Sequence, residues 1–204
     1  MDFTGGAAFE NPDNWHSRGY LPHYDASSKY QMLTYRLADS LPANFSLPGS
    51  AGGSPAEKLE RRKLIEQVLD NGYGSCVLKI PEVATLVEDN FKYFDKKKYD
   101  LIAYVVMPNH VHLLIKTYDG FPLSEIIHSW KSFTSRQILK TLENMNEFSS
   151  VFKDKKVWQK EYWDRFIRSH EHYLKAIEYI HQNPVKAGLV SNAKDWIWSS
   201  AKVL

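Results

Sequence analysis

Apolar, aromatic and β-branched residues gather in several short runs separated by polar and turn residues, which is the pattern of β-strands. Pro108 and Asn109 separate two adjacent stretches, so these two strands should form a hairpin. The short apolar stretch at residues 76–80 is also predicted to be extended. The predicted strands are residues 30–37, 99–107 and 110–117, followed by a strand or extended segment at 158–168.

Other stretches repeat their apolar residues with helical spacing. Ser54 and Pro55 form a cap-then-proline start for the first helix. Pro184 should stop the last one, because a proline pushes the residue before it out of the α region. The predicted helices are residues 55–71, 81–94, 122–142 and 170–183.

This order of elements predicts an α+β fold, with helices on one face of an antiparallel sheet and the other face free for a ligand. Residues 1–28, which lack periodicity, are expected to form an irregular arm. The remaining residues, 29–204, should form a single catalytic domain. Within it we expect a palm at about 29–145 and a C-terminal region at about 146–204.

Composition narrows the class of protein. The chain has 204 residues and a net charge of only +2, but residues 151–204 carry ten Lys or Arg against six Asp or Glu. A basic end suits a phosphate backbone, and the 28 aromatic residues include candidates for base stacking. Cys76 is the sole cysteine, which excludes an intrachain disulfide. No apolar run reaches the length of a membrane span, so we expect a soluble, cytoplasmic protein without a membrane partner.

Two histidines stand two residues apart on a predicted strand. His110 and His112 should therefore project from one face while Val111 and Leu113 enter the core on the other. Two imidazoles this close can share a metal ion.

A tyrosine and an amide share one face of the last predicted helix. Tyr179 and Asn183 are four residues apart. A phenol beside a metal held by two histidines and a carboxamide oxygen is suited to attack on phosphorus, with the tyrosine forming a covalent intermediate.

Three strings in this order resemble the REP-associated tyrosine transposases, relatives of single-tyrosine insertion-sequence transposases of the His-hydrophobic-His class. They are RGYLPH at residues 18–23, YVVMPNHVHLL at 104–114 and YIHQNPVKAGLV at 179–190. The resemblance runs from about Trp15 to Ser200. It implies a ferredoxin-like palm similar to an RNA-recognition module, with the nucleophile on a C-terminal helix.

The resemblance also implies an activity, namely cleavage and rejoining of single-stranded DNA beside an imperfect hairpin through a 5′-phosphotyrosine. His110 and His112 match the metal histidines of the family, and Tyr179 matches its nucleophile. Asn183 stands where related enzymes carry a glutamine as third ligand, and His181 and Gln182 are rival ligands. The expected ion is Mg²⁺ or Mn²⁺. Family members include monomers and homodimers, and both states stay open here.

Further residues are candidates for the nucleophile, for base stacking and for phosphate contacts. Tyr162 is a rival nucleophile that lacks an amide partner four residues later. Trp130 and Trp163 are candidate stacking platforms for bases. The residues proposed to contact DNA phosphates are Lys131, Arg136, Arg165, Arg168 and Lys175.

Two rival functions belong to other classes. A non-catalytic nucleic-acid-binding regulator would keep the sheet but has no use for both histidines and the tyrosine. A zinc hydrolase would require a further His, Cys or carboxylate ligand at short spacing, and the sequence shows no clear one.

Overall fold

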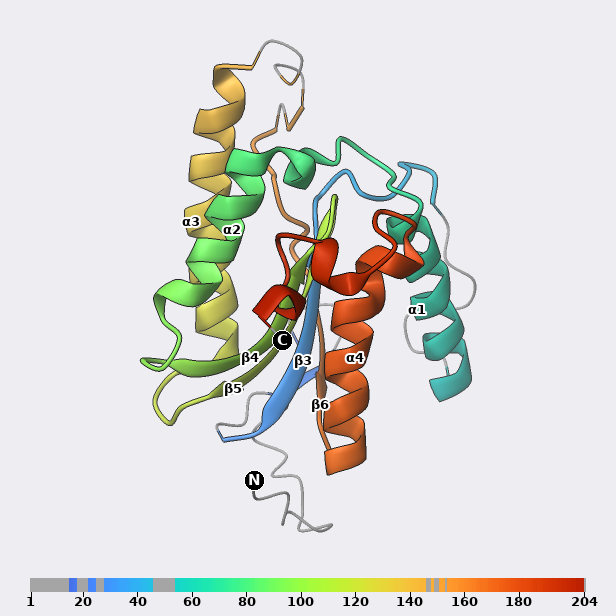
Figure 1. Cartoon of the computed structure of the whole chain (residues 1–204), viewed down its shortest axis with the longest axis vertical. Coiled ribbons are helices and arrows are strands. Elements are labelled where there is room, and N and C mark those ends of the chain that lie inside the picture. The colour runs from blue at the N-terminus through green and yellow to red at the C-terminus, as the bar shows by residue number, and fades with distance from the viewer. Residues whose placement is uncertain are drawn as a thin grey trace.

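Four antiparallel strands form the central sheet of the protein, which is described here from a computed structural model (Figure 1). The strands lie in the order β4 (Tyr99–Val106), β5 (His110–Thr117), β3 (Tyr30–Arg36) and β6 (Trp163–Phe166). The structure describes residues 15–17, 22–24, 28–45, 54–145, 148, 151–152 and 154–203.

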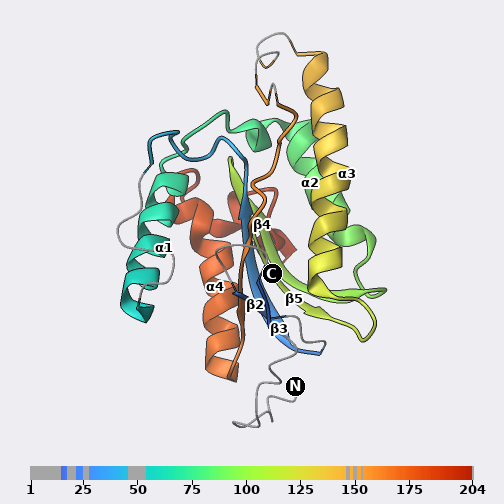
Figure 2. The ribbon, with the colours of Figure 1, turned by 180° about the vertical axis from the view of Figure 1, so that it is seen from behind.

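Helices cover both faces of this sheet. α2 (Pro81–Tyr93) and α3 (Leu123–Glu143) pack side by side on one face. α4 (His170–Lys186) packs on β4 and β5 from the other, and α1 (Pro55–Asp70) lies beside α4 (Figures 1 and 2). The prediction that one face would be free for a ligand is therefore wrong, because α4 covers it.

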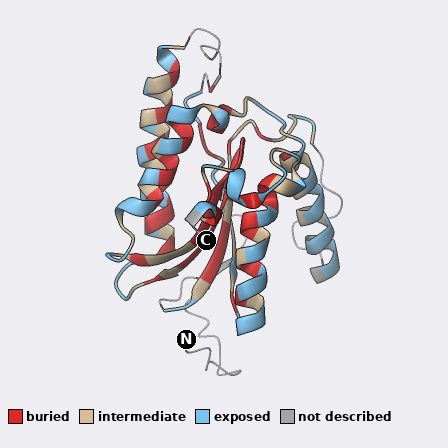
Figure 3. Ribbon diagram, in the orientation of Figure 1, coloured by how far each residue is buried: buried red, intermediate tan, exposed pale blue. Residues whose placement is uncertain are grey.

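The predicted α+β class is confirmed. The elements β3, α2, β4, β5, α3 and β6 follow the β-α-β-β-α-β order of a ferredoxin-like fold, and α1 is an additional helix between β3 and α2. Alternation along β5 divides the core as predicted, since Val111 and Leu113 join the cluster under α2 and α3 while Leu114 joins the cluster under α4. Figure 3 shows this buried sheet between exposed outer helix faces.

The helix boundaries follow local chemistry. Ser54 caps α1 as predicted, and with Glu57 it forms a reciprocal capping box. α4 runs one turn beyond its predicted end at Asn183, so that prediction is corrected. Pro184 lies in the last turn, where its missing N–H removes only one helical bond, and the helix closes at Ala187 instead.

Two other segments differ from prediction. The apolar piece at 76–80 contains a 3₁₀ turn, Val77–Lys79, in place of a strand. Part of the predicted irregular arm pairs as two short strands, β1 (Trp15–Ser17) and β2 (Pro22–Tyr24). The segment 158–168, predicted as a strand or extended segment, is confirmed: it contains β6 and one bridge at Trp158, and the carbonyls between them bond to a lysine side chain.

No helix in the described part of the chain combines the length and apolarity that a membrane crossing requires.

The C-terminal segment, residues 196–203, lies along the edge of β4 that pairs with no other strand of the sheet. Val106 donates its backbone N–H to the Trp198 carbonyl at 2.9 Å. Behind this edge, buried Glu88 accepts hydrogen bonds from the Tyr104 hydroxyl at 2.6 Å and Lys202 at 2.9 Å, and Lys92 pairs with it at 3.0 Å. Burial alone would raise the pKa of Glu88, but these three partners outweigh it and hold the pKa below its usual value.

We expect Glu88→Gln to reduce the free energy of unfolding at pH 7 by about 1–3 kcal/mol. A depressed folded-state pKa means that the carboxylate stabilises the fold above the ordinary glutamate range and stops doing so as the pH falls through the folded value. Urea unfolding from pH 7 to pH 3 should therefore show a shallower acid loss for the variant. Glu82 is exposed on the same helix, so Glu82→Gln should lose stability with falling pH as the wild type does. If Glu88→Gln loses as much stability as the wild type between pH 7 and pH 3, Glu88 does not stabilise the fold in this way.

Candidate active site

Two histidines on β5 meet in the interior beneath α4. His110 and His112 are each 1% exposed, and their Nε2 atoms lie 3.0 Å apart. Two ligand atoms bound to one ion at about 2.1 Å and at right angles are themselves about 3 Å apart, so this spacing suits a shared ion. The sequence predicted both imidazoles on an open sheet face, whereas the structure buries them.

The amide of Asn109 determines the tautomer of His110. Its Nδ2 donates to the backbone carbonyls of Leu69 at 3.2 Å and Tyr73 at 2.9 Å, which leaves its Oδ1 facing His110 Nδ1 at 2.7 Å. An amide oxygen only accepts, so His110 must donate from Nδ1. The Nε2 lone pair of His110 therefore points toward His112.

His112 is oriented from the neighbouring strand. Its Nδ1 lies 2.7 Å from the Thr34 hydroxyl on β3. Burial lowers the pKa of His110 to about 3, and burial with the charges of His110 and Arg62 lowers the pKa of His112 well below its usual value. Both rings are thus neutral, the state in which imidazole binds metal.

α4 brings the phenol and the amide to this pair. The ring of Tyr179 lies edge-on to His112, with centroids 5.3 Å apart. The Asn183 side chain is close enough to His112 to raise its pKa, and Asn183 Nδ2 donates to the Tyr179 carbonyl at 2.7 Å. The structure therefore gathers all four residues that the sequence proposed for catalysis and metal binding.

Two residues of α1 that the sequence analysis missed also reach Tyr179. Burial raises the pKa of the Tyr179 phenol, the charge of Glu66 raises it further, and the charge of Arg62 lowers it. Lys186 lies over the ring at 4.7 Å from its centroid. No sequence pattern linked α1 to the histidines. Asn109, in contrast, directly precedes His110 in the string at residues 104–114.

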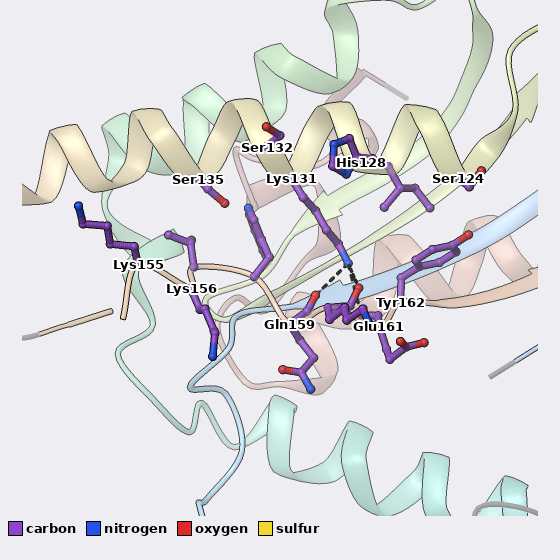
Figure 4. Close-up of a pocket in the computed structure, with 14 residues that line it drawn as sticks. Ser124, His128, Lys131, Ser132, Ser135, Lys155, Lys156, Gln159, Glu161 and Tyr162 are labelled. Atoms are coloured by element: carbon purple, nitrogen blue, oxygen red, sulfur yellow. Dashed lines mark hydrogen bonds between the residues drawn. The ribbon is translucent and has the colours of Figure 1, made fainter. Parts of the chain in front are cut away.

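The rival residues lie elsewhere. His181 Nε2 bonds to the Ser200 hydroxyl at 2.8 Å, which turns the ring toward the C-terminal segment, and Gln182 is exposed. Tyr162 lines a cleft of about 380 Å³ between α3 and residues 155–162, on the opposite face of the sheet from the histidines (Figure 4).

Lys131 points into this same cleft. Its ammonium donates to the backbone carbonyls of Gln159, Lys160 and Glu161 at 2.9, 3.1 and 3.3 Å (Figure 4). Burial lowers the pKa of Lys131 to about 8. This lysine is committed to the protein backbone, so the proposed phosphate contact is withdrawn.

The other DNA-contact candidates divide between the two faces. Arg165 and Trp163 lie on β6 with their side chains on the histidine face, because Trp163 pairs with Thr34, which also pairs with His112. Arg168 lies over the ring of Phe166. The remaining candidates fit less well: Arg136 is exposed on α3 across the sheet, Lys175 pairs with Glu171, and Trp130 is buried among core aromatics.

Known proteins share this arrangement of elements. A family model described as "Transposase IS200 like" matches residues 81–183, about half of the chain. The chain belongs to the IS200-like transposase family. The matched residues include the histidine pair, Tyr179 and Asn183, but not α1.

Two relatives of this transposase are REP-associated tyrosine transposases. The chain is 30% identical over 103 residues to a candidate member from Haemophilus influenzae and 29% identical over 104 residues to one from Escherichia coli K12. These matches cover 50% and 51% of this chain, and 58% and 55% of the relatives. A solved REP-associated tyrosine transposase bound to a REP hairpin superposes with a TM-score of 0.55 at 17% identity, over 90% of this chain and 82% of the other.

We expect Lys131→Met to lower the free energy of unfolding by about 1–3 kcal/mol, because three backbone carbonyls lose their donor. Lys175→Met, which removes an exposed ion pair, should stay within about 0.5 kcal/mol of wild type. Urea denaturation followed by tryptophan fluorescence measures both. Equal stabilities for the two variants would show that the lysine does not hold this segment.

Proposed function

We propose that this transposase cleaves and rejoins single-stranded DNA beside repeat hairpins, with Tyr179 as the nucleophile. The observation that carries the proposal is the contact of the Tyr179 ring with His112, whose Nε2 lies 3.0 Å from that of His110. A phenol beside two converging imidazoles is an arrangement for attack on a phosphodiester.

A divalent cation, Mg²⁺ or Mn²⁺, is part of this proposal. The donor set fits, since the two Nε2 atoms converge to 3.0 Å, the separation of two imidazole nitrogens that share one ion. His110 and His112 would hold the ion with Asn183 as a third, oxygen ligand. When bound, such an ion neutralises charge on the scissile phosphate. In the described part of the chain, no cluster of three or more His, Cys, Asp or Glu offers an alternative site.

The chain's own residues then carry out the transfer. The Tyr179 oxygen bonds to phosphorus, the bond from phosphorus to the 3′ oxygen breaks, and a 5′-phosphotyrosine and a free 3′-hydroxyl result. Attack by another 3′-hydroxyl reverses the step and rejoins the strand. The phosphodiester count is unchanged, so no external energy source is required.

The nucleic acid proposed is single-stranded or hairpin DNA. The solved relative is bound to a REP hairpin. Arg165 extends from the histidine face to the β6 edge, where its cation can accept a phosphate, whereas one side of the neighbouring Trp163 ring is already covered by Arg62. Binding should weaken as salt rises, because contacts with phosphates release counterions.

Tyr179→Phe should abolish the covalent DNA adduct while leaving the fold and DNA affinity unchanged, because only the attacking oxygen is lost. The assay is incubation with 3′-labelled single-stranded oligonucleotides that span the repeats around its own gene, because the 3′ fragment is the one that stays on the tyrosine, followed by denaturing gels and peptide mapping. Tyr162→Phe is the matched control and should keep the adduct. A nucleotide remnant on Tyr162 would reassign the nucleophile, and binding without any adduct would favour a non-catalytic regulator.

His110→Ala and His112→Ala should each abolish cleavage but retain hairpin binding. Asn109→Ala, which frees the His110 ring, should weaken Mn²⁺ binding by about 10–100-fold, because the residue that orients a metal ligand is lost. Isothermal titration with Mn²⁺ measures this directly. Wild-type Mn²⁺ affinity in either histidine variant would remove the metal assignment.

A further inference from the structure

The cleft between α3 and residues 155–162 lies on the face of the sheet opposite the histidines (Figure 4). One wall is a polar stripe of α3, whose residues recur at about one helical turn and so share one face of the helix. Buried residues such as Trp130 and Ile138 occupy the face toward the sheet. The residues of the polar stripe are Ser124, His128, Lys131, Ser132 and Ser135.

The second wall of the cleft is basic, and Lys131 fixes its backbone. The Lys131 ammonium bonds to the carbonyls of Gln159, Lys160 and Glu161, so it shapes the wall without being available to a ligand. Lys155 and Lys160 are exposed on this wall, and Glu161 is the only carboxylate among the described residues that line the cleft. The lining thus combines an excess of cations with hydroxyl donors, the groups that contact DNA phosphates.

The size of the cleft favours a single strand over a duplex. Its volume of about 380 Å³ is near the lower end of the range for small-molecule sites, about 300–1,000 Å³, which leaves room for about one nucleotide and none for a double helix. Tyr162 projects from residues 155–162 toward α3, and its ring is partly exposed (Figure 4). An unpaired base that enters the cleft can therefore contact an aromatic ring.

β6 connects the cleft with the histidine face. It is the last strand in the order of the sheet, and successive residues of a strand point to opposite faces. Tyr162, directly before β6, lines the cleft, whereas Arg165 on β6 lies on the histidine face. The two residues are three positions apart, about 10 Å along an extended chain. One DNA strand can therefore pass around this edge and contact both faces.

We propose that the cleft is a second binding site for single-stranded DNA, which holds a flank of the strand that Tyr179 cleaves. The identity of the ligand rests on the proposed function. Lys155 and Lys160 bind its phosphates, and the hydroxyls of Ser132 and Ser135 donate hydrogen bonds to phosphate oxygens. Held on both faces of the sheet, the strand is bent around β6 while its scissile phosphate lies beside Tyr179.

The first test measures binding of fluorescent single-stranded oligonucleotides from the same repeats, by anisotropy over a range of salt concentrations. The full chain carries Tyr179→Phe, so that no adduct forms. Adding Lys155→Gln with Lys160→Gln should weaken binding on the order of tenfold at about 0.15 M salt. It should also reduce the slope of log Kd against log salt by up to about 1.4, because each phosphate contact of a single strand contributes about 0.7.

The matched control is Lys140→Gln with Lys194→Gln, which removes the same charge from exposed positions outside the cleft. This control should keep the slope and stay within about twofold of the parent affinity. Equal losses in the two double variants would reveal a general effect of net charge and overturn the proposal.

The second test places the DNA in the cleft without changing charge. A photoreactive p-benzoylphenylalanine at position 132, inside the cleft, should crosslink to the single-stranded flank of the scissile phosphate. The same group at position 133, exposed on another face of α3, should not. Crosslinking from neither position, or equally from both, overturns the proposal. Absence of an adduct in the wild-type protein removes the proposed chemistry, whereas a wild-type adduct without a crosslink at position 132 removes this inference alone.

Discussion

The approach of two buried imidazoles to 3.0 Å is the constraint on which the rest of the site depends. Neither ring carries a charge, so the arrangement holds only if each Nδ1 is anchored from outside the pair. Asn109 anchors one ring and is itself bonded to one carbonyl in the last turn of α1 and one in the turn that follows, while Thr34 anchors the other ring from β3. The histidine pair therefore depends on the β3–β5 register and on the position of the C-terminal end of α1.

The second requirement is that α4 lies on the sheet. Its apolar residues Tyr173, Ala176 and Ile180 pack against Met32 and Leu114, and this contact both excludes water from the histidines and sets the rotation of the helix. Tyr179 precedes Ile180 by one residue, about 100° around the helix, so its ring reaches the edge of the packed face beside His112. Burial of the apolar stripe thus positions the nucleophile.

The sequence predicted those parts of the structure that depend on local spacing. The hairpin, the shared face of His110 and His112 and the capping of α1 all follow from residues within one turn or one strand of each other. Features that depend on distant contacts were missed. α4 covers the histidines, Lys131 donates to three carbonyls 28 to 30 residues away, and Glu66 acts on the pKa of Tyr179. Each of these features joins segments whose relative position no local sequence pattern encodes.

The charged groups around the Tyr179 phenol set its pKa and therefore determine when it can react. Burial and the Glu66 carboxylate raise the pKa of Tyr179, while Arg62 lowers it and Lys186 lies over the ring. The net effect is upward, so the phenol stays protonated in the resting protein and is a poor nucleophile there. A phosphodiester that enters this site adds a further negative charge, which disfavours a preformed phenolate even more. Attack and proton loss are therefore expected to occur together, which requires cations close enough to the oxygen to offset the negative charge as it develops.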